Sequence, residues 1–162
     1  MKNLEMHQVW MDRAIALAKE AGAAGEIPVG AVIVNSVGVE IATGVNCKKR
    51  DQDPTAHAEI VAIREASRVL NDWHLKGYTL YVTLEPCPMC AGAILQARIS
   101  TLVYGADDPK TGAIRTVANL PDSPMSFHKL EAIAGIREQE CQKLLLDWFE
   151  NHRRYLLHSE LI

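Results

Sequence analysis

Apolar positions recur with a helical period in several segments of the chain. In residues 7–23, apolar side chains return every three or four positions with charged residues on the opposite side, and Gly22 and Gly25 follow the last of them. Residues 88–99 are almost wholly apolar, and residues 137–157 form a long periodic run. These three segments are predicted to be helices.

A fourth helix is predicted over residues 53–70. Apolar residues keep helical spacing through this segment. Asp53 is the expected N-cap, and Pro54 is the expected first helical residue, because proline there loses no hydrogen bond. We therefore expect the helix to begin at this Asp-Pro pair.

Short β-branched runs predict the strands. Residues 29–46 contain two such runs around an Asn-Ser-Val-Gly turn, which indicates an antiparallel hairpin, and the first run is apolar throughout, as in a strand covered on both faces. Residues 77–85 and 101–106 flank the helix at 88–99, so they should form a parallel pair. The loop-rich segment 107–128 follows. The pattern predicts an α/β protein, a three-layer α/β/α domain on a mixed sheet of about five strands.

Composition fits one domain over residues 1–162. Apolar residues make up 48% and charged residues 23%, as in a globular protein, and no run approaches the roughly 20 apolar residues of a membrane span. The first residues lack the pattern of a secretion signal, so we expect a cytoplasmic location. The net charge of −3 means that a nucleic-acid partner would need a local basic patch.

Candidate chemistry is concentrated in two short motifs, His57-Ala58-Glu59 and Pro86-Cys87-Pro88-Met89-Cys90. Each lies at the predicted start of a helix, where the positive end of the helix dipole favours a thiolate. Two thiolates and one imidazole suit Zn²⁺ and leave a fourth position for water, which zinc activates at neutral pH. Glu59, in the irregular first turn, could then move protons without binding the metal.

Other interpretations of the cysteines stay open at this point. A thioredoxin-like redox pair also puts Cys-x-x-Cys at a strand-to-helix turn but has no use for His57 and Glu59. A structural zinc site needs a fourth protein ligand, and the two motifs could also be unrelated core residues. The candidate fourth ligands are Cys47, His74, His128 and Cys141.

The pattern His-x-Glu…Pro-Cys-x-x-Cys resembles the zinc-dependent nucleoside and nucleobase deaminases, and the chain is most similar to their tRNA adenosine deaminase branch. The segments that carry the resemblance are "GEIPVGAVIV" (25–34), "GVN" (44–46), "DPTAHAEI" (53–60), "YVTLEPCPMCAGAI" (81–94), "VYGADDPKTGA" (103–113) and, more loosely, "LLLDWFENHRR" (144–154).

The resemblance implies a cytidine-deaminase-like fold that binds one Zn²⁺ per subunit through His57, Cys87 and Cys90, with Glu59 as the proton shuttle. The implied reaction converts the wobble adenosine of a tRNA anticodon stem-loop to inosine, with the adenosine flipped out of its loop. A homodimer is also implied.

The resemblance further implies five substrate-binding residues. Asn46 would hydrogen-bond the flipped base, for which an amide that both donates and accepts is suited. Asp108 and Lys110 would contact the neighbouring backbone, although Asp-Asp-Pro-Lys-Thr-Gly is also an ordinary charged turn. Phe149 and Arg153 would cover the anticodon loop, and from its spacing Phe149 could equally be a core residue.

Three basic segments, 47–51, Lys110 and 152–154, could supply phosphate contacts if the fold gathers them around one pocket. The chain departs from the family pattern at residues 112–124, where a Gly-Ser pair often follows Gly-Ala. The resemblance therefore implies the chemical reaction but does not imply which RNA contacts this loop makes.

Three alternative functions remain. A free-guanine deaminase shares His-Ala-Glu and Pro-Cys-Pro-Met-Cys, but a basic C-terminal helix would be of no use to it. A deaminase of riboflavin biosynthesis usually carries a reductase domain, for which this chain has no room. A catalytically silent, zinc-stabilised RNA-binding subunit would not need the proton shuttle Glu59.

Overall fold

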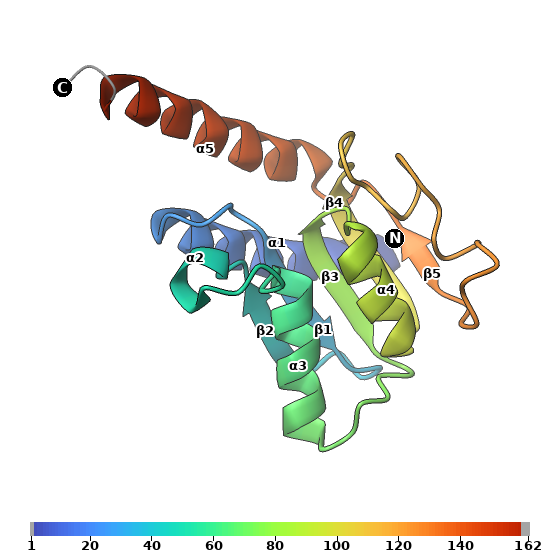
Figure 1. Ribbon diagram of the computed structural model, residues 1–162. Coiled ribbons are helices and arrows are strands. Elements are labelled where there is room, and N and C mark those ends of the chain that lie inside the picture. Colours follow the sequence, from blue (N-terminus) through green and yellow to red (C-terminus); the bar gives the residue numbers. More distant parts are fainter. Residues whose placement is uncertain (1, 160–162) are drawn as a thin grey trace.

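The computed structural model describes the backbone of residues 2–159 and the side chains of residues 3–153. A five-stranded sheet carries helices on both faces, and one long helix runs across the end of the sheet (Figure 1). The helices are α1 (Lys2–Ala23), α2 (Lys48–Asp51), α3 (Ala58–Leu70), α4 (Pro88–Gln96) and α5 (Glu138–Ser159). The strands are β1 (Gly30–Val34), β2 (Glu40–Val45), β3 (Thr79–Leu84), β4 (Thr101–Ala106) and β5 (Glu131–Ile133).

The sheet is mixed, with strand order β2-β1-β3-β4-β5. β1 pairs antiparallel with both β2 and β3, whereas β3, β4 and β5 run parallel to one another. The hairpin predicted over residues 29–46 and the parallel pair around α4 are therefore both confirmed. All five residues of β1 are buried, which agrees with the apolar run.

Alternating side chains of the central strands build two cores, one on each face of the sheet. On one face, side chains such as Ile33 and Leu80 pack with the inner sides of α3 and α4. On the other, Val32 and Tyr81 pack with α1, and Cys141 of α5 joins them. Because successive residues of a strand point to opposite faces, a sheet with two buried faces yields the three predicted layers.

Two glycines, one facing each side of the sheet, allow a helix to pack closely against a strand. A Cβ on Gly30 of β1 would lie 2.6 Å from the backbone nitrogen of Ala18 in α1. A Cβ on Gly44 of β2 would lie 2.6 Å from the backbone nitrogen of Ala62 in α3. Both spacings are shorter than any van der Waals contact, so any larger residue would push the helix away from the strand.

The predicted start of the helix at 53–70 is wrong. The α-helix begins at Ala58 with His57 as its N-cap, because the Asp53 carboxylate instead accepts hydrogen bonds from the backbone N–H (2.8 Å) and hydroxyl (2.7 Å) of Thr55. These bonds close a turn over residues 53–55, and the backbone of this turn is not helical. Asp side chains often form such local hydrogen bonds with the backbone.

Two short elements were not predicted individually. β5 has only three residues with little burial, and α2 has four residues, so neither leaves a periodic pattern. The first helix begins at Lys2, five residues before the predicted start, and ends at Ala23 as expected. Within the described residues, no helix is both long and apolar enough to cross a membrane.

Candidate metal centre

Two helix N-termini meet at one end of the sheet and carry the two sequence motifs. His57 is the N-cap of α3, and Cys87 is the N-cap of α4. Both helices lie on the same face of the sheet, packed through their alanines. Backbone bonds hold the entry to α3, since the N–H of Cys47 donates to the carbonyl of Ala56 (3.1 Å). The N-termini of α3 and α4, which carry partial positive charge, therefore both lie at the site of His57 and Cys87.

His57, Cys87 and Cys90 have the geometry of a zinc site. Nδ1 of His57 lies 3.6 Å from Sγ of Cys87 and 3.4 Å from Sγ of Cys90, and the three ligand atoms lie within 4.8 Å of one another. Tetrahedral zinc, with bonds of about 2.3 Å to sulfur and about 2.0 Å to nitrogen, would separate such ligands by about 3.5 Å. The donor set and its spacing fit Zn²⁺, with a fourth position left for water or substrate.

The protonation of the two cysteines is unequal. The hydrogen bond with Cys90, helped by His57, lowers the pKa of Cys87 to about 4. The same bond with Cys87, together with burial, raises the pKa of Cys90 far above its usual value. The pair thus holds one thiolate at neutral pH, and a bound cation would favour loss of the second proton.

Glu59 lies beside this cluster with only 4% of its surface exposed. Burial raises the pKa of its carboxyl group to about 7, against the opposing effects of His57 and Cys90. A carboxyl group with a pKa near neutrality can both accept and release a proton under working conditions. We call His57, Glu59, Cys87 and Cys90 the floor of the site.

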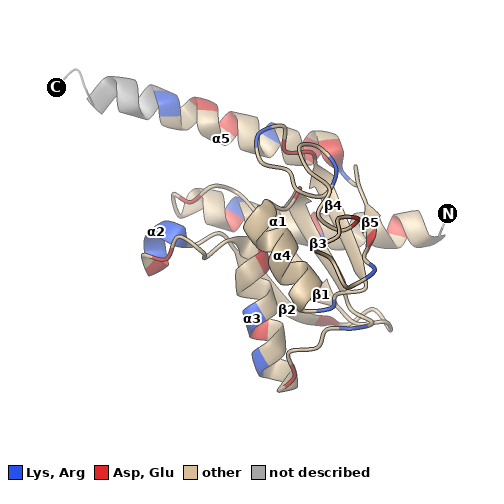
Figure 2. Cartoon of the chain, turned by 45° about the vertical axis from the view of Figure 1, so that its right-hand side comes forward, with Lys and Arg blue, Asp and Glu red and all other residues tan. Residues whose placement is uncertain are grey.

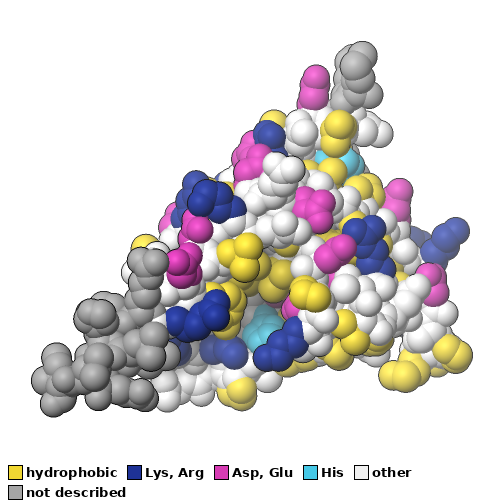
Figure 3. Space-filling view, turned by 90° about the horizontal axis from the view of Figure 1, so that it is seen from above, with side chains coloured by type: hydrophobic (Ala, Val, Ile, Leu, Met, Phe, Trp, Pro, Cys, Tyr) yellow, Lys and Arg dark blue, Asp and Glu magenta, His cyan; other side chains and the backbone are white. Residues whose placement is uncertain are grey.

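A cavity of about 730 Å³ opens above the floor. Figure 3 shows a histidine at the bottom of a hollow whose edges carry both apolar and basic side chains. Its walls come from residues 27–29, which precede β1, from the ends of β3 and β4, and from three surface segments that together we call the rim: α2, residues 107–116 (the rim loop) and α5. Apolar residues line most of the walls: Ile27, Val29, Leu84, Leu145, Leu146 and Phe149.

Asn46 lies in the wall of the cavity and is 6% exposed. Its Oδ1 accepts a hydrogen bond from the N–H of Lys48 (3.3 Å), so it is both a turn residue and a lining residue. Lys48 lines the same cavity at the start of α2, where Lys and Arg residues gather (Figure 2). The sequence predicted phosphate contacts for the basic segment 47–51 as a whole but not for Lys48 in particular.

Asp108 and Lys110 both line the cavity from the rim loop. The Asp108 carboxylate accepts bonds from the N–H of Lys110 (2.9 Å) and from the N–H and hydroxyl of Thr111, which closes the turn expected from the sequence. The rim loop also surrounds the buried carboxylate of Glu85, which sequence reasoning missed. Burial alone would raise the pKa of Glu85, but hydrogen bonds from Thr116 and from backbone N–H groups outweigh it and lower that pKa.

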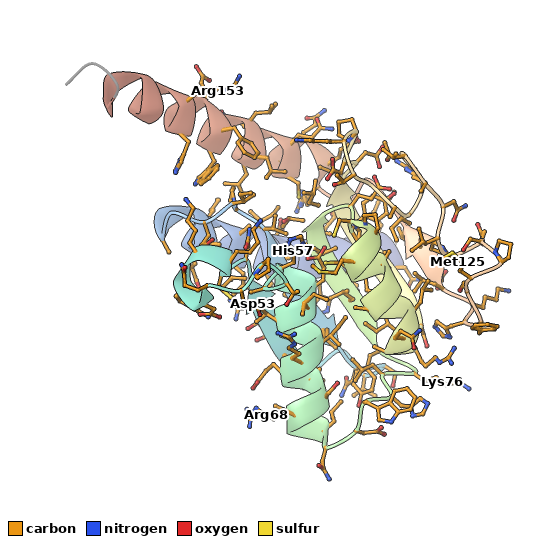
Figure 4. The ribbon with its side chains drawn as sticks, in the orientation of Figure 1. Asp53, His57, Arg68, Lys76, Met125 and Arg153 are labelled. Carbon is orange, nitrogen blue, oxygen red and sulfur yellow. The ribbon has the colours of Figure 1, made fainter. Side chains whose placement is uncertain are left out.

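The two residues predicted on α5 lie differently. Phe149 lines the cavity, whereas Arg153 is exposed and points away from the body of the protein, on the side of α5 opposite to His57 (Figure 4). α5 is fixed over the cavity where the indole N–H of Trp148 donates to the carbonyl of Gly22 (3.4 Å). The side chain of Arg154, the last residue of the basic segment 152–154, lies outside the described residues.

Within the described part of the chain, no fourth protein ligand joins the cluster. Among the described residues, the group that could hold a metal contains only His57, Cys87 and Cys90. Cys47 donates to Asp51 (3.2 Å), and Cys141 is buried in the core on the other face of the sheet. A closed structural zinc site is therefore not the arrangement seen here.

Comparisons with known proteins agree with this geometry. The tRNA-specific adenosine deaminase of Bacillus subtilis is 44% identical over 147 residues, which cover 91% of each chain. A solved structure from work on A-to-I editing by tRNA:A34 deaminases is 43% identical, with a TM-score of 0.82 over 84% of this chain and 98% of that one. A guanine deaminase from Bacillus subtilis is 48% identical but covers 62% of this chain, with a TM-score of 0.60.

The model of one protein family, described as the cytidine and deoxycytidylate deaminase zinc-binding region, matches residues 4–106. This range contains the whole floor of the site and four of the five strands. With its ligand geometry and its three-layer fold, the chain belongs to this family of zinc-binding deaminases.

Proposed function

We propose that the protein converts the wobble adenosine of a tRNA anticodon to inosine by hydrolytic deamination. The observation that carries the proposal is the buried Glu59 beside a three-ligand zinc site, at the bottom of a cavity with a basic rim. Relatives named as tRNA adenosine deaminases align over nearly their whole length, which supports this substrate over a free base.

The chemistry divides between the metal and the chain. His57, Cys87 and Cys90 would hold the zinc, which would lower the pKa of a bound water and so supply a nucleophile at neutral pH. Glu59 would take one proton from the attacking water and deliver it to the ring nitrogen next to the reacting carbon. It would then take the second proton from the hydroxyl added to that carbon and pass it to the amino group, which leaves as ammonia. Its raised pKa suits both directions of transfer.

The cavity walls orient the base. We assign Asn46 to hydrogen-bond the base edge, because its amide can donate and accept at a buried position. The apolar side chains of Val29 and Leu84 on the walls and Phe149 on α5 pack against the purine and exclude water. Such a pocket needs a nucleotide that has left its stack, as in a splayed anticodon loop.

The rim is assigned to the RNA backbone. Lys48 and Lys110 line the cavity mouth, where they can neutralise phosphates on either side of the flipped nucleotide. Asp108 lies on the same loop, within reach of ribose hydroxyl groups. Arg153 faces away from the cavity, so any RNA that it contacts would lie outside the pocket.

We further propose that the active form is a homodimer in the cytoplasm, where its tRNA substrate is found. The dimer rests on the family resemblance. Light scattering of the zinc-loaded protein should give about twice the chain mass of 17.9 kDa. A single-chain mass over the working concentration range would contradict the dimer.

The decisive experiment measures the mass of the anticodon fragment before and after the reaction. Zinc-loaded protein is incubated with transcribed tRNA carrying a wobble adenosine, and the anticodon fragment is analysed by mass. We expect a gain of about one mass unit in the wild type and in Glu65→Ala, because hydrolysis replaces an amino group (NH₂) with a hydroxyl group (OH). Glu65 lies on the same helix, exposed and ion-paired with Arg68, so it controls for the substitution.

Glu59→Ala should keep its zinc and lose activity by roughly 10²–10⁴-fold, the usual contribution of general acid-base catalysis. Release of ammonia from free guanine with unchanged tRNA would instead support a nucleobase deaminase. No reaction of the zinc-loaded wild type with either substrate would favour a silent RNA-binding module.

A further inference from the structure

Glu85 is a fully buried carboxylate, 1% exposed, at the end of β3. Oε1 accepts hydrogen bonds from the backbone N–H groups of Ile114 (3.1 Å), Arg115 (2.8 Å) and Thr116 (3.0 Å). Oε2 accepts from the N–H of Asp108 (3.0 Å) and from the Thr116 hydroxyl. All five donors belong to the rim loop, so the loop closes around the carboxylate as it would around a bound anion.

The main chain next to Glu85 completes this attachment. The N–H of Glu85 donates to the carbonyl of Ala106 (2.8 Å), and the N–H of Ala113 donates to the carbonyl of Pro86 (2.9 Å). Gly112 leaves room for the carboxylate, because a Cβ at that position would collide with a carboxylate oxygen of Glu85. The rim loop is therefore built on residues 85 and 86.

The position of Glu85 in the chain links the rim to the floor. Cys87, a proposed zinc ligand, follows only two residues later. At the other end of the hydrogen bonds, the loop carries Asp108 and Lys110 to the cavity mouth. One short segment thus fixes both the metal ligand and the loop that faces the substrate.

We propose that Glu85 is a positioning residue for the reaction, which sets the distance and orientation of the rim loop relative to the zinc site. This inference rests on the proposed function, because the loop matters only if it contacts the substrate. Glu85 borders the cavity, but both of its carboxylate oxygens accept hydrogen bonds from the rim loop. It acts through the placement of Asp108 and Lys110.

The geometry predicts how Glu85→Gln would fail. An amide NH₂ at the Oε1 position would meet three N–H donors, so the NH₂ should occupy the Oε2 position instead. There the Thr116 hydroxyl can turn to accept, but the N–H of Asp108 faces another donor. The loop should stay attached at residues 114–116 and detach at Asp108, the end that carries the substrate contacts.

The test compares steady-state deamination of an anticodon stem-loop by four zinc-loaded proteins: wild type, Glu85→Gln, Lys110→Ala and the double variant. We expect Glu85→Gln to raise KM about tenfold, the usual effect of one lost charged hydrogen bond, with kcat and zinc content nearly unchanged. Because Glu85 acts through the rim loop, the KM of the double variant should lie within about threefold of that of Lys110→Ala.

Glu65→Gln is the matched control, since it makes the same change on an exposed carboxylate of α3 and should leave KM unchanged. Independent effects, in which the double variant shows the product of the two single changes, would overturn the inference. So would a KM of Glu85→Gln within twofold of the wild type. If Glu85→Gln does not fold, Thr116→Val removes only the hydroxyl donor and should raise KM about threefold; an unchanged KM would overturn the proposal.

Hydrogen exchange separates this inference from the proposed function. In Glu85→Gln, the amide of Asp108 should exchange faster while the amides of residues 114–116 stay protected, whether or not the protein acts on tRNA. A wild type that leaves tRNA unchanged would contradict the proposed function alone. An Asp108 amide with unchanged exchange would contradict the positioning role alone.

Discussion

The floor and the rim of the site are held in place by different interactions. The floor lies at the N-termini of two helices that pack against the sheet, and Cys90 and Glu59 are buried there. The rim consists of the short helix α2, the rim loop and α5, whose cavity-facing ends are more exposed and which are attached by hydrogen bonds together with a few core contacts such as that of Cys141.

This difference suggests that chemistry and recognition can be damaged separately. A change in the floor should alter metal content and turnover, because the core that surrounds it cannot rearrange without cost. A change in an exposed side chain of the rim should alter substrate affinity and its salt dependence, because such side chains lie at the cavity mouth, where phosphates would bind. The following variants test that separation.

The largest effect is expected for Cys90→Ala in the floor. Removal of one thiolate leaves two ligands, so zinc content should fall below about a tenth per chain and turnover by roughly 10³-fold or more. Zinc is measured by elemental analysis after gel filtration. Cys141→Ala is the matched control, since this buried cysteine lies in the core on the opposite face of the sheet and should keep its zinc.

The next effect concerns the two glycines that face helices. Gly44→Ala and Gly30→Ala should each lower the free energy of unfolding by about 3 kcal/mol, the upper part of the usual range for overpacking. Only Gly44→Ala should also lower zinc affinity, because Gly44 contacts α3, whose N-cap is His57. Equal zinc affinities in the two variants, measured by competition with a chelator, would contradict a floor set by helix packing.

A moderate effect is expected at the rim. Lys110→Ala should raise KM for the stem-loop about tenfold, leave kcat nearly unchanged and reduce the slope of log affinity against log salt by about 1, as for one lost phosphate contact. Lys129, exposed and outside the cavity, provides the control substitution to alanine. A fall in kcat without a change in KM would place Lys110 in the chemical step instead.

The smallest effect distinguishes the two residues of α5. Phe149→Ala should raise KM about fivefold, the lower end of the usual stacking contribution of about 1–3 kcal/mol per base, because this side chain is 42% exposed. Arg153→Ala should change KM less than twofold, since its side chain faces away from the cavity. A larger effect for Arg153 than for Phe149 would mean that the RNA wraps around the outer side of α5.

The sequence predicted the layers and the grouping of His57, Cys87 and Cys90, for physical reasons that apply to particular residues. Buried strands such as β1 leave a continuous apolar run, and His57, Cys87 and Cys90 have few other reasons to occur at helix starts. The start of α3 was predicted wrongly because Asp53 can cap a helix or close a turn with Thr55, and only the surrounding fold decides between them.

The contacts of the rim could not be predicted in the same way. Glu85 attaches the rim loop mainly through backbone N–H groups. Because almost every residue has such a group, the sequence does not show which ones will bind Glu85. The one available signal was an acidic residue directly after the buried strand β3, where a lone charge needs partners. Likewise, the outward direction of Arg153 depends on how α5 docks through Trp148.

The strand order has a consequence for how the protein folds. β1 pairs with β3 across a segment that contains β2, α2 and all of α3, and α4, which follows β3, lies on the face occupied by α3. We therefore expect the two helix ends that carry the candidate metal ligands to meet late in folding, after contacts between distant parts of the chain have formed. We expect zinc to slow unfolding strongly while leaving the folding rate almost unchanged. Bound metal would therefore increase the kinetic stability of the native state.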